Sequence, residues 1–171
     1  MQQTLLALLA LMVATLLSLS QMQSRLQDQK EVYQSEMKEM AIGVATQSLE
    51  VVRARAFDEN TIGVPKDSIT NPSALTSPPF TSGNHCQAFG GSDACDDIDD
   101  FNEMQPAIVP FEAPDFTVDF EVKAKVRYVD ASLNPVTSPT FRKEVVFEIQ
   151  DTGPDPYIKE PITFSEVLTY N

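Results

Sequence analysis

The residues best suited to chemistry lie in one Gly-, Ser- and Asp-rich stretch near the middle of the chain. It holds both cysteines, Cys86 and Cys95, and the only histidine, His85. Two close cysteines, in a chain with an apolar N-terminus typical of exported proteins, indicate a disulfide that closes a small loop. A metal site is the alternative, but this spacing is wide for a metal motif and His85 leaves a fourth ligand missing. We therefore expect a Cys86–Cys95 disulfide, with His85 as a surface loop residue.

An acidic run overlaps this stretch and offers a second kind of chemistry. Its members are Asp93, Asp96, Asp97, Asp99, Asp100 and Glu103. Carboxylate oxygens are the ligands that Ca²⁺ prefers, but the run lacks the spacing of an EF-hand loop. Acidic runs are usually solvated surface, so we predict no metal ligands here and leave Ca²⁺ binding by residues 93–103 open.

No arrangement of residues predicts catalysis. Any Ser/His or Cys/His pair would have to use His85, because the chain has one histidine. The sequence contains no nucleophile elbow, phosphate-binding glycine loop or metalloprotease helix. Its tyrosines and phenylalanines mostly follow a strand pattern, which is typical of a sheet core. We therefore expect no enzyme, no cofactor and no small-molecule ligand.

The element that must organise the rest is the first stretch, residues 1–57. It opens with an uncharged apolar block from Leu5 to Leu19, and apolar residues then recur every three or four positions, with no proline before Pro65. This spacing predicts one helix on the order of 80 Å long. The residues expected on its assembly face are Leu5, Leu9, Leu16, Leu19, Met22 and Leu26. A single small domain cannot cover such a helix, so lipid or copies of the chain must bury it.

The apolar block has two interpretations, a cleaved signal peptide and a retained helix. A signal peptide begins with a basic region, whereas residues 1–4 carry no Lys or Arg. Residues 1–24 have no charged side chain, which is long enough for a membrane span. We therefore expect a retained helix, either spanning a membrane or forming the core of a filament.

Residues 58–171 form the remaining part, which we call the head. The chain has 12 basic and 25 acidic residues, and residues 1–57 carry five of each, so the whole net charge of −13 lies on the head. An acidic surface argues against nucleic acid and anionic lipid headgroups as partners. Residues 58–115 are rich in Ser, Thr, Asn, Pro and Gly. They predict a loop region that wraps over the helix and a sheet edge and is pinned by the disulfide.

The last third, residues 116–171, has the alternation of β-strands. Apolar and polar residues alternate over 116–128, 141–149 and 162–170, with Pro- and Gly-containing turns between them. No crossover helix is available, so the strands must form an antiparallel meander. The predicted fold is α+β, with a long N-terminal helix, apolar then amphipathic, packed on a C-terminal antiparallel sheet with a disulfide-pinned loop region.

This layout resembles the type IV pilin class, which includes bacterial pilins and the pseudopilins of type II secretion. The likeness covers the whole chain in layout, but few family motifs are present. Leu5 stands where most members carry a Glu that pairs with the N-terminal amine of a neighbour. Met22 stands where a proline often kinks the helix, and both cysteines precede the strands instead of lying near the C-terminus. The chain is thus similar to a divergent member with a straighter helix.

The resemblance implies a structural subunit of an extracellular, cell-surface pilus-like filament that serves adhesion, motility or surface attachment. Its partners would be copies of itself, joined through the N-terminal helix, and the inner membrane would hold the precursor before assembly. The alternative is a single-pass membrane-anchored extracellular β module that binds a partner without polymerising. The apolar block distinguishes these hypotheses, because it contacts protein in a filament and lipid in an anchor.

Overall fold

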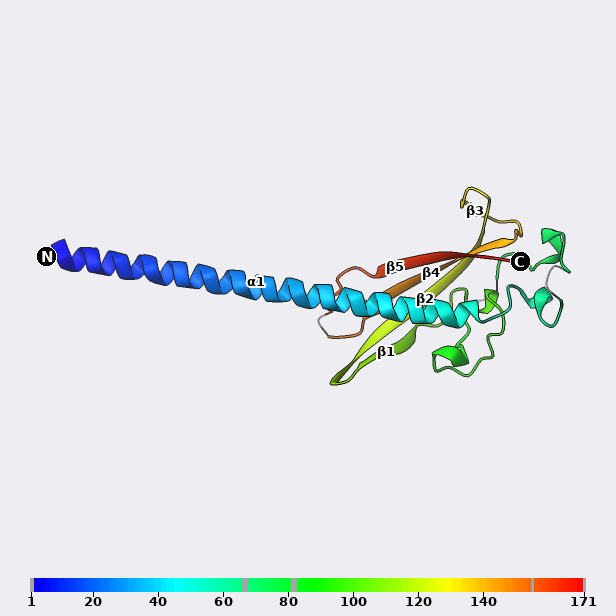
Figure 1. Ribbon diagram of the computed structural model, residues 1–171, viewed down its shortest axis with the longest axis horizontal. Helices are drawn as coiled ribbons and strands as arrows, with labels where there is room; N and C mark the ends of the chain where they lie inside the picture. The colour runs from blue at the N-terminus through cyan, green and yellow to red at the C-terminus, as the bar shows by residue number, and fades with distance from the viewer. Residues whose placement is uncertain (1, 66–67, 81–82, 155, 171) are drawn as a thin grey trace. The chain divides into compact units, whose positions relative to one another are not determined.

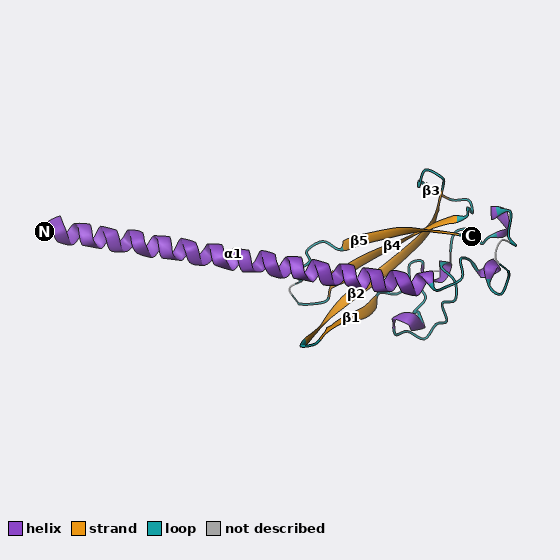
Figure 2. Ribbon diagram, viewed as in Figure 1, coloured by secondary structure: helices purple, strands orange, loops and turns teal. Residues whose placement is uncertain are grey.

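The computed structural model describes residues 2–65, 68–80, 83–154 and 156–170, with side chains in the helix described from Leu9 onward. The chain divides into two compact units, residues 1–37 and 38–171. Figures 1 and 2 show one long helix and an antiparallel sheet. The elements are α1 (Gln2–Arg53), β1 (Ala107–Ala113), β2 (Phe116–Val129), β3 (Pro135–Val136), β4 (Arg142–Asp151) and β5 (Ile162–Thr169).

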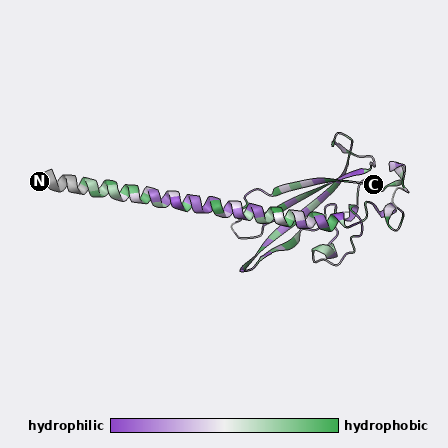
Figure 3. Ribbon diagram, viewed as in Figure 1, coloured by the Kyte–Doolittle hydropathy of each residue, from purple (hydrophilic) through white to green (hydrophobic). Residues whose placement is uncertain are grey.

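The first unit is the N-terminal part of α1. It is an unbroken helix because residues 2–37 contain neither glycine nor proline and are rich in Leu, Ala, Gln and Met, which are good helix formers. Every described side chain from Leu9 to Tyr33 is exposed. Figure 3 shows the most hydrophobic part of this stretch near its N-terminal end.

The second unit is built on the sheet. Its strand order is β1-β2-β4-β5, every neighbouring pair is antiparallel, and the short β3 pairs with the end of β2. On β2 and β4 the buried residues face each other in register, as Val122 with Ile149, Ala124 with Phe147 and Val126 with Val145. The predicted antiparallel meander is confirmed.

The last part of α1 covers the apolar face of the sheet (Figure 1). Its buried residues recur every three or four positions, as one face of a helix requires: Ala41, Val44, Ala45, Ser48, Leu49 and Val52. The opposite face of the sheet is solvated and carries the cross-strand ion pairs Lys125–Glu148 and Arg127–Glu144. The predicted fold class is therefore confirmed.

The end of α1 differs from the prediction. The helix ends at Arg53, four residues before Phe57. The chain then leaves helical geometry because Ala56 pairs with the acidic loop. Its N–H donates to Asp96 O over 3.0 Å, and its carbonyl accepts from Ile98 N over 3.0 Å.

The loop region holds more regular structure than expected. Strand β1 lies within residues 58–115, which the sequence assigned to loops. Pro110 interrupts the strand pattern there, but β1 is an edge strand that pairs only with β2, where a missing N–H is tolerated. Four short 3-10 helices are also present among the described residues, at Glu59–Thr61, Pro72–Ala74, Gln87–Phe89 and Asp99–Phe101.

Candidate functional site

The predicted assembly face lies on the exposed part of α1. Leu9, Leu16, Leu19, Met22 and Leu26 are each between 58% and 66% exposed. Leu5 lies outside the residues whose side chains are described. Other large apolar side chains of the same stretch are exposed as well, namely Leu11, Met12, Val13 and Leu17. The block is thus apolar around most of the helix, a pattern typical of a helix that is buried by a partner.

The expected transmembrane helix is not supported. From Leu9 onward, where side chains are described, no helix is apolar over a sufficient length to cross a membrane. The span expected over residues 1–24 begins in residues 1–8, whose side chains lie outside this description.

The predicted disulfide is confirmed. Cys86 and Cys95 are bonded, with their Cα atoms 5.4 Å apart. The loop that they close is tight, because Gly91 N donates to Cys86 O over 2.9 Å and Asp93 N donates to His85 O over 2.9 Å. A Cβ atom at Gly91 would lie only 1.9 Å from His85 O, so no larger residue fits there.

The residues of the acidic run do not form one site, because they accept hydrogen bonds from different local partners. Asp93 accepts from His85 N over 2.8 Å, and this hydrogen bond lowers the pKa of the Asp93 carboxyl. Asp97 accepts from Asp100 N over 3.0 Å, and Asp100 in turn accepts from Asn84 Nδ2. Within the described part of the chain, no three His, Cys, Asp or Glu side chains are grouped so that they could hold a metal ion.

The most unusual polar site was not predicted from the sequence. It is a buried cluster around Lys143 of β4, whose side chain is fully buried. The Lys143 Nζ donates to Phe57 O over 2.7 Å and to Asp58 Oδ2 over 3.0 Å, and it lies 2.6 Å from Asp99 Oδ1. The cluster therefore joins the sheet to the segment after α1 and to the acidic loop.

Asp58 is the ionised carboxylate of this cluster. Besides Lys143, it accepts hydrogen bonds from Asn60 N and from both the N–H and the hydroxyl of Thr76. Burial acts to raise the pKa of Asp58, but the charge of Lys143 and these hydrogen bonds outweigh it and lower the pKa below its ordinary value. Asp58 also caps the 3-10 helix Glu59–Thr61.

Asp99 has a different environment although it faces the same lysine. Its side chain is 8% exposed, and its Oδ1 forms a buried ion pair with the Lys143 Nζ at 2.6 Å. Burial raises the pKa of Asp99 to about 7, and the charge of Lys143 only partly opposes this effect. Asp97, also buried, has its pKa raised chiefly by burial. Asp58 and Asp99, which contact the same Lys143 amine, thus have pKa values shifted in opposite directions.

Aromatic rings enclose the amine. The Lys143 Nζ lies 4.6 Å from the ring centroid of Phe57, 5.4 Å from that of Phe80 and 5.1 Å from that of Tyr128. The Tyr128 hydroxyl lies 3.0 Å from Asp58 Oδ2 and 2.9 Å from Thr76 O. Burial, followed by the charges of Asp58 and Asp99, raises the pKa of Tyr128, so its hydroxyl stays protonated. The rings exclude water and strengthen the electrostatic contacts inside.

One sequence signal for this cluster exists. Lys143 stands two positions before Val145, in the inward register of β4 that Phe147 and Ile149 continue. A lysine in that register must either be buried or break the pattern, which marks it as unusual. Its partners could not be found in this way, because Asp58 and Asp99 lie in loops far away in the sequence.

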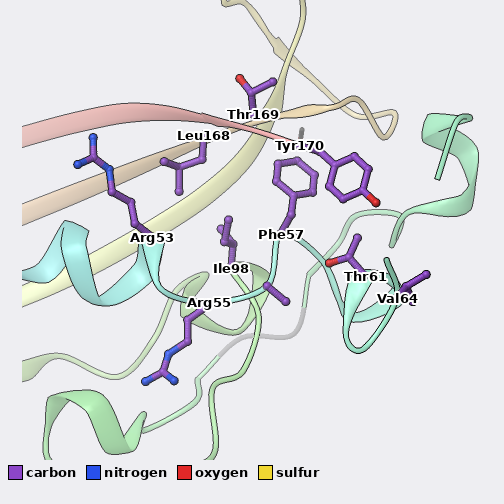
Figure 4. Close-up of a pocket in the computed structure, with 10 residues that line it drawn as sticks. Arg53, Arg55, Phe57, Thr61, Val64, Ile98, Leu168, Thr169 and Tyr170 are labelled. Atoms are coloured by element: carbon purple, nitrogen blue, oxygen red, sulfur yellow. The ribbon is translucent and has the colours of Figure 1, made fainter. Parts of the chain in front are cut away.

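A surface pocket of about 360 Å³ lies beside the C-terminal end of α1 (Figure 4). Phe57 and Tyr170 form one wall, with their ring centroids 5.6 Å apart. Arg53 and Arg55 point away from each other, and Arg53 pairs with Glu166 of β5. The described lining residues include no His, Cys, Asp or Glu, so they supply no acid–base pair.

Comparisons with protein-family models, with curated proteins and with solved structures find no match to this chain.

Proposed function

We propose that this chain is a structural subunit of an extracellular pilus-like filament and that it polymerises through the N-terminal part of α1. The observation that supports the proposal is the exposure of the apolar block. Every described side chain from Leu9 to Tyr33 is exposed, including a run of large apolar residues. Soluble monomers rarely expose a contiguous apolar surface of this kind, which usually marks an interaction site.

The energetic argument favours copies of the same chain as the partner. Burying one large apolar side chain contributes ~1.5–3 kcal/mol. The block from Leu9 to Leu19 carries several such residues on all sides, so parallel helices packed around it would gain on the order of 10 kcal/mol per subunit. A bundle of identical helices provides this burial on every side of the helix.

Two further features fit an extracellular filament. A disulfide such as Cys86–Cys95 forms and persists in oxidising compartments, which include the cell surface. The net charge of −13 lies on residues 58–171, so outward-facing heads would keep the polymer soluble and repel one another sideways. A membrane-held precursor would be the stage before assembly.

A pair of matched substitutions tests this proposal. Leu16 is 66% exposed on α1, and Leu133 is 58% exposed in a turn of the head. Because both leucines are exposed in the single chain, neither Leu16→Glu nor Leu133→Glu should change the fold of the subunit. We expect Leu16→Glu to abolish or strongly reduce filaments, because it would bury a charge in the helical core. Leu133→Glu should leave the filaments intact.

Electron microscopy of surface material sheared from cells that produce each variant gives the result. Normal filaments from Leu16→Glu would contradict assembly through this face. If no variant forms filaments and the wild-type chain stays monomeric and membrane-bound, the chain is instead an anchored module that binds a partner without polymerising.

A further inference from the structure

Strand β5 forms an open edge of the sheet (Figure 2). Just beyond its end, Tyr170 N donates to Phe141 O over 3.0 Å, and hydrogen-bonded pairs alternate along an antiparallel ladder. Even-numbered residues of β5 therefore bond to β4, whereas the odd-numbered residues direct their N–H and C=O groups away from the sheet. These are Thr163, Ser165, Val167 and Thr169. Within the described part of the chain, their outward backbone groups have no hydrogen-bond partner.

The other edge strand, β1, is protected, whereas β5 is not. Thr152 N donates to Asp119 O over 3.2 Å, so by the same alternation Asp119 faces β4 and its partner on β1, Pro110, faces the open side. A proline there removes a donor from the edge, a common protection against edge pairing. Strand β5 contains no Pro, Gly, Lys or Arg, and its register with β4 runs without a bulge. Its one charged residue, Glu166, pairs with Arg53.

The inward face of β5 is also incompletely covered. Ile162 and Phe164 are only half-buried, although their register partners on β4, Ile149 and Phe147, are fully buried. A further strand beside β5 would cover Ile162 and Phe164, as β5 covers the side chains of β4. Pairing at this edge would therefore bury apolar surface in addition to forming backbone hydrogen bonds.

We propose that β5 pairs edge to edge with β5 of a second copy of this chain, in antiparallel orientation. The partner must itself offer a free strand edge, and among the described strands at the two ends of the sheet only β5 offers one without a proline. The outward positions of β5 are uncharged and Glu166 is neutralised by Arg53, so two heads can meet here although the chain carries a net charge of −13.

The contact joins filaments side by side, and in this respect it rests on the proposed function. Identical strands that pair antiparallel are related by a two-fold axis. Helices within one filament are parallel, so the two β5 strands belong to neighbouring filaments that run in opposite directions.

Glu166 determines the register. A two-fold axis at Glu166 would place two carboxylates directly opposite each other, which is destabilising. An axis at Val167 instead places Glu166 opposite Leu168 and pairs Ser165 with Thr169 of the other strand. The two Val167 Cα atoms are then about 5.5 Å apart, the spacing of a hydrogen-bonded antiparallel pair.

A single contact of this kind is weak. The net gain from a few backbone hydrogen bonds barely offsets the translational and rotational freedom that two free heads lose on association. Isolated heads therefore stay monomeric. Two filaments present many β5 strands, so the first contact makes the following ones intramolecular and the weak contacts add up.

Val167→Pro tests the proposal. It removes only an outward N–H, so the hydrogen bonds between β5 and β4 remain, as β1 tolerates Pro110. Val167→Thr keeps the N–H and the branched shape and is the matched control. We expect negative-stain electron microscopy to show laterally bundled filaments for the wild type and Val167→Thr, and an equal quantity of single filaments for Val167→Pro. Higher salt should promote wild-type bundles, because it screens the repulsion between acidic heads.

A cysteine cross-link tests the register. Oxidised filaments of Val167→Cys should give covalent dimers on a non-reducing gel, because a Cα separation of about 5.5 Å suits a disulfide. Thr163→Cys is the control, since its backbone also faces outward but lies far from its own copy in this register, and it should give none. Absence of dimers from Val167→Cys would contradict the pairing.

The remaining outcomes separate this contact from the proposed function. Single wild-type filaments, or bundles of Val167→Pro as frequent as those of the wild type, overturn the pairing and leave polymerisation through α1 intact. A second polypeptide that copurifies with wild-type filaments and is lost from Val167→Pro would show that β5 takes a strand of another protein instead. Absence of filaments from every variant and from the wild type contradicts both proposals.

Discussion

Replacing Lys143 by methionine tests whether the buried cluster stabilises the head. Methionine keeps much of the length and volume of the side chain but removes the amine. The change takes away the donor to Phe57 O and Asp58 Oδ2 and the neighbour of Asp99. Removing one partner of a buried ion pair generally costs about 3–5 kcal/mol, because the other charge stays buried and uncompensated.

The structure places the cost of Lys143→Met near the lower end of this range. Asp58 keeps hydrogen bonds from Asn60, Thr76 and Tyr128, so its charge remains partly solvated by the protein. Asp99, with a pKa already raised to about 7, can become neutral by taking up a proton. We therefore expect a loss of about 3 kcal/mol in the free energy of unfolding, which lowers the melting temperature by roughly 6–12 °C.

Lys125→Met is the matched control. Lys125 pairs with Glu148 at 2.8 Å, but both side chains are substantially exposed. Such pairs contribute roughly 0.2–1 kcal/mol. Thermal and urea unfolding of each full-length variant, followed by circular dichroism, gives the loss in the free energy of unfolding for Lys143→Met and for Lys125→Met. Equal losses for the two variants would refute the reasoning that the buried cluster fastens the loop region to the sheet.

Three further predictions concern the head. Gly91→Ala should lower the free energy of unfolding by about 1–3 kcal/mol, because the new Cβ would lie 1.9 Å from His85 O. Gly153→Ala is the control and should be close to neutral, because its new Cβ would lie 3.8 Å from the nearest atom. Equal stability of the two variants in urea unfolding would contradict the tight packing of the disulfide loop. Replacing Cys86 and Cys95 together by serine should lower the free energy of unfolding, measured in urea, by roughly 2–3 kcal/mol. Thiol labelling of the unreduced, denatured wild-type chain should find no free cysteine. Asp97→Asn should stabilise the chain at neutral pH. Burial raises the pKa of Asp97, so the folded state holds the proton more tightly than the unfolded state, and the Asp97 contribution falls as pH rises above the ordinary carboxyl value of about 4. Melting curves of wild type and Asp97→Asn should therefore converge in acid, and a constant difference at every pH would contradict this assignment.

The helix and strands that were predicted correctly are those in which apolar residues recur at a regular spacing. The three- and four-residue spacing over α1 and the alternation over β2, β4 and β5 follow directly from burial of one face. The same reasoning missed β1, because Pro110 breaks the alternation and only the edge position makes it acceptable. It also extended α1 to Phe57, because the pairing of Ala56 with the acidic loop is a tertiary contact that leaves no mark on periodicity.

The candidate sites also divide into those that the sequence could predict and those that only the folded structure reveals. Cys86 and Cys95 were predictable because they are close in the sequence and no other cysteine competes. The cluster of Lys143, Asp58 and Asp99 was not, because only folding brings these three residues together and nothing links their sequence positions. In the acidic run, by contrast, closeness in the sequence does not produce a common site. Its residues look like one group in the sequence, yet they turn toward different partners, such as His85 N for Asp93 and Lys143 for Asp99.

Removal of residues 1–20 tests assembly through the N-terminal helix most directly. The buried face of α1 begins at Ala41, so the truncated chain keeps every element of the second unit. We expect the full-length chain to form filaments in negative-stain electron microscopy. The truncated chain should be a folded monomer, with the Cys86–Cys95 disulfide intact, in analytical ultracentrifugation. A truncated chain that still sediments as a polymer would show that the apolar block is not the core of the assembly.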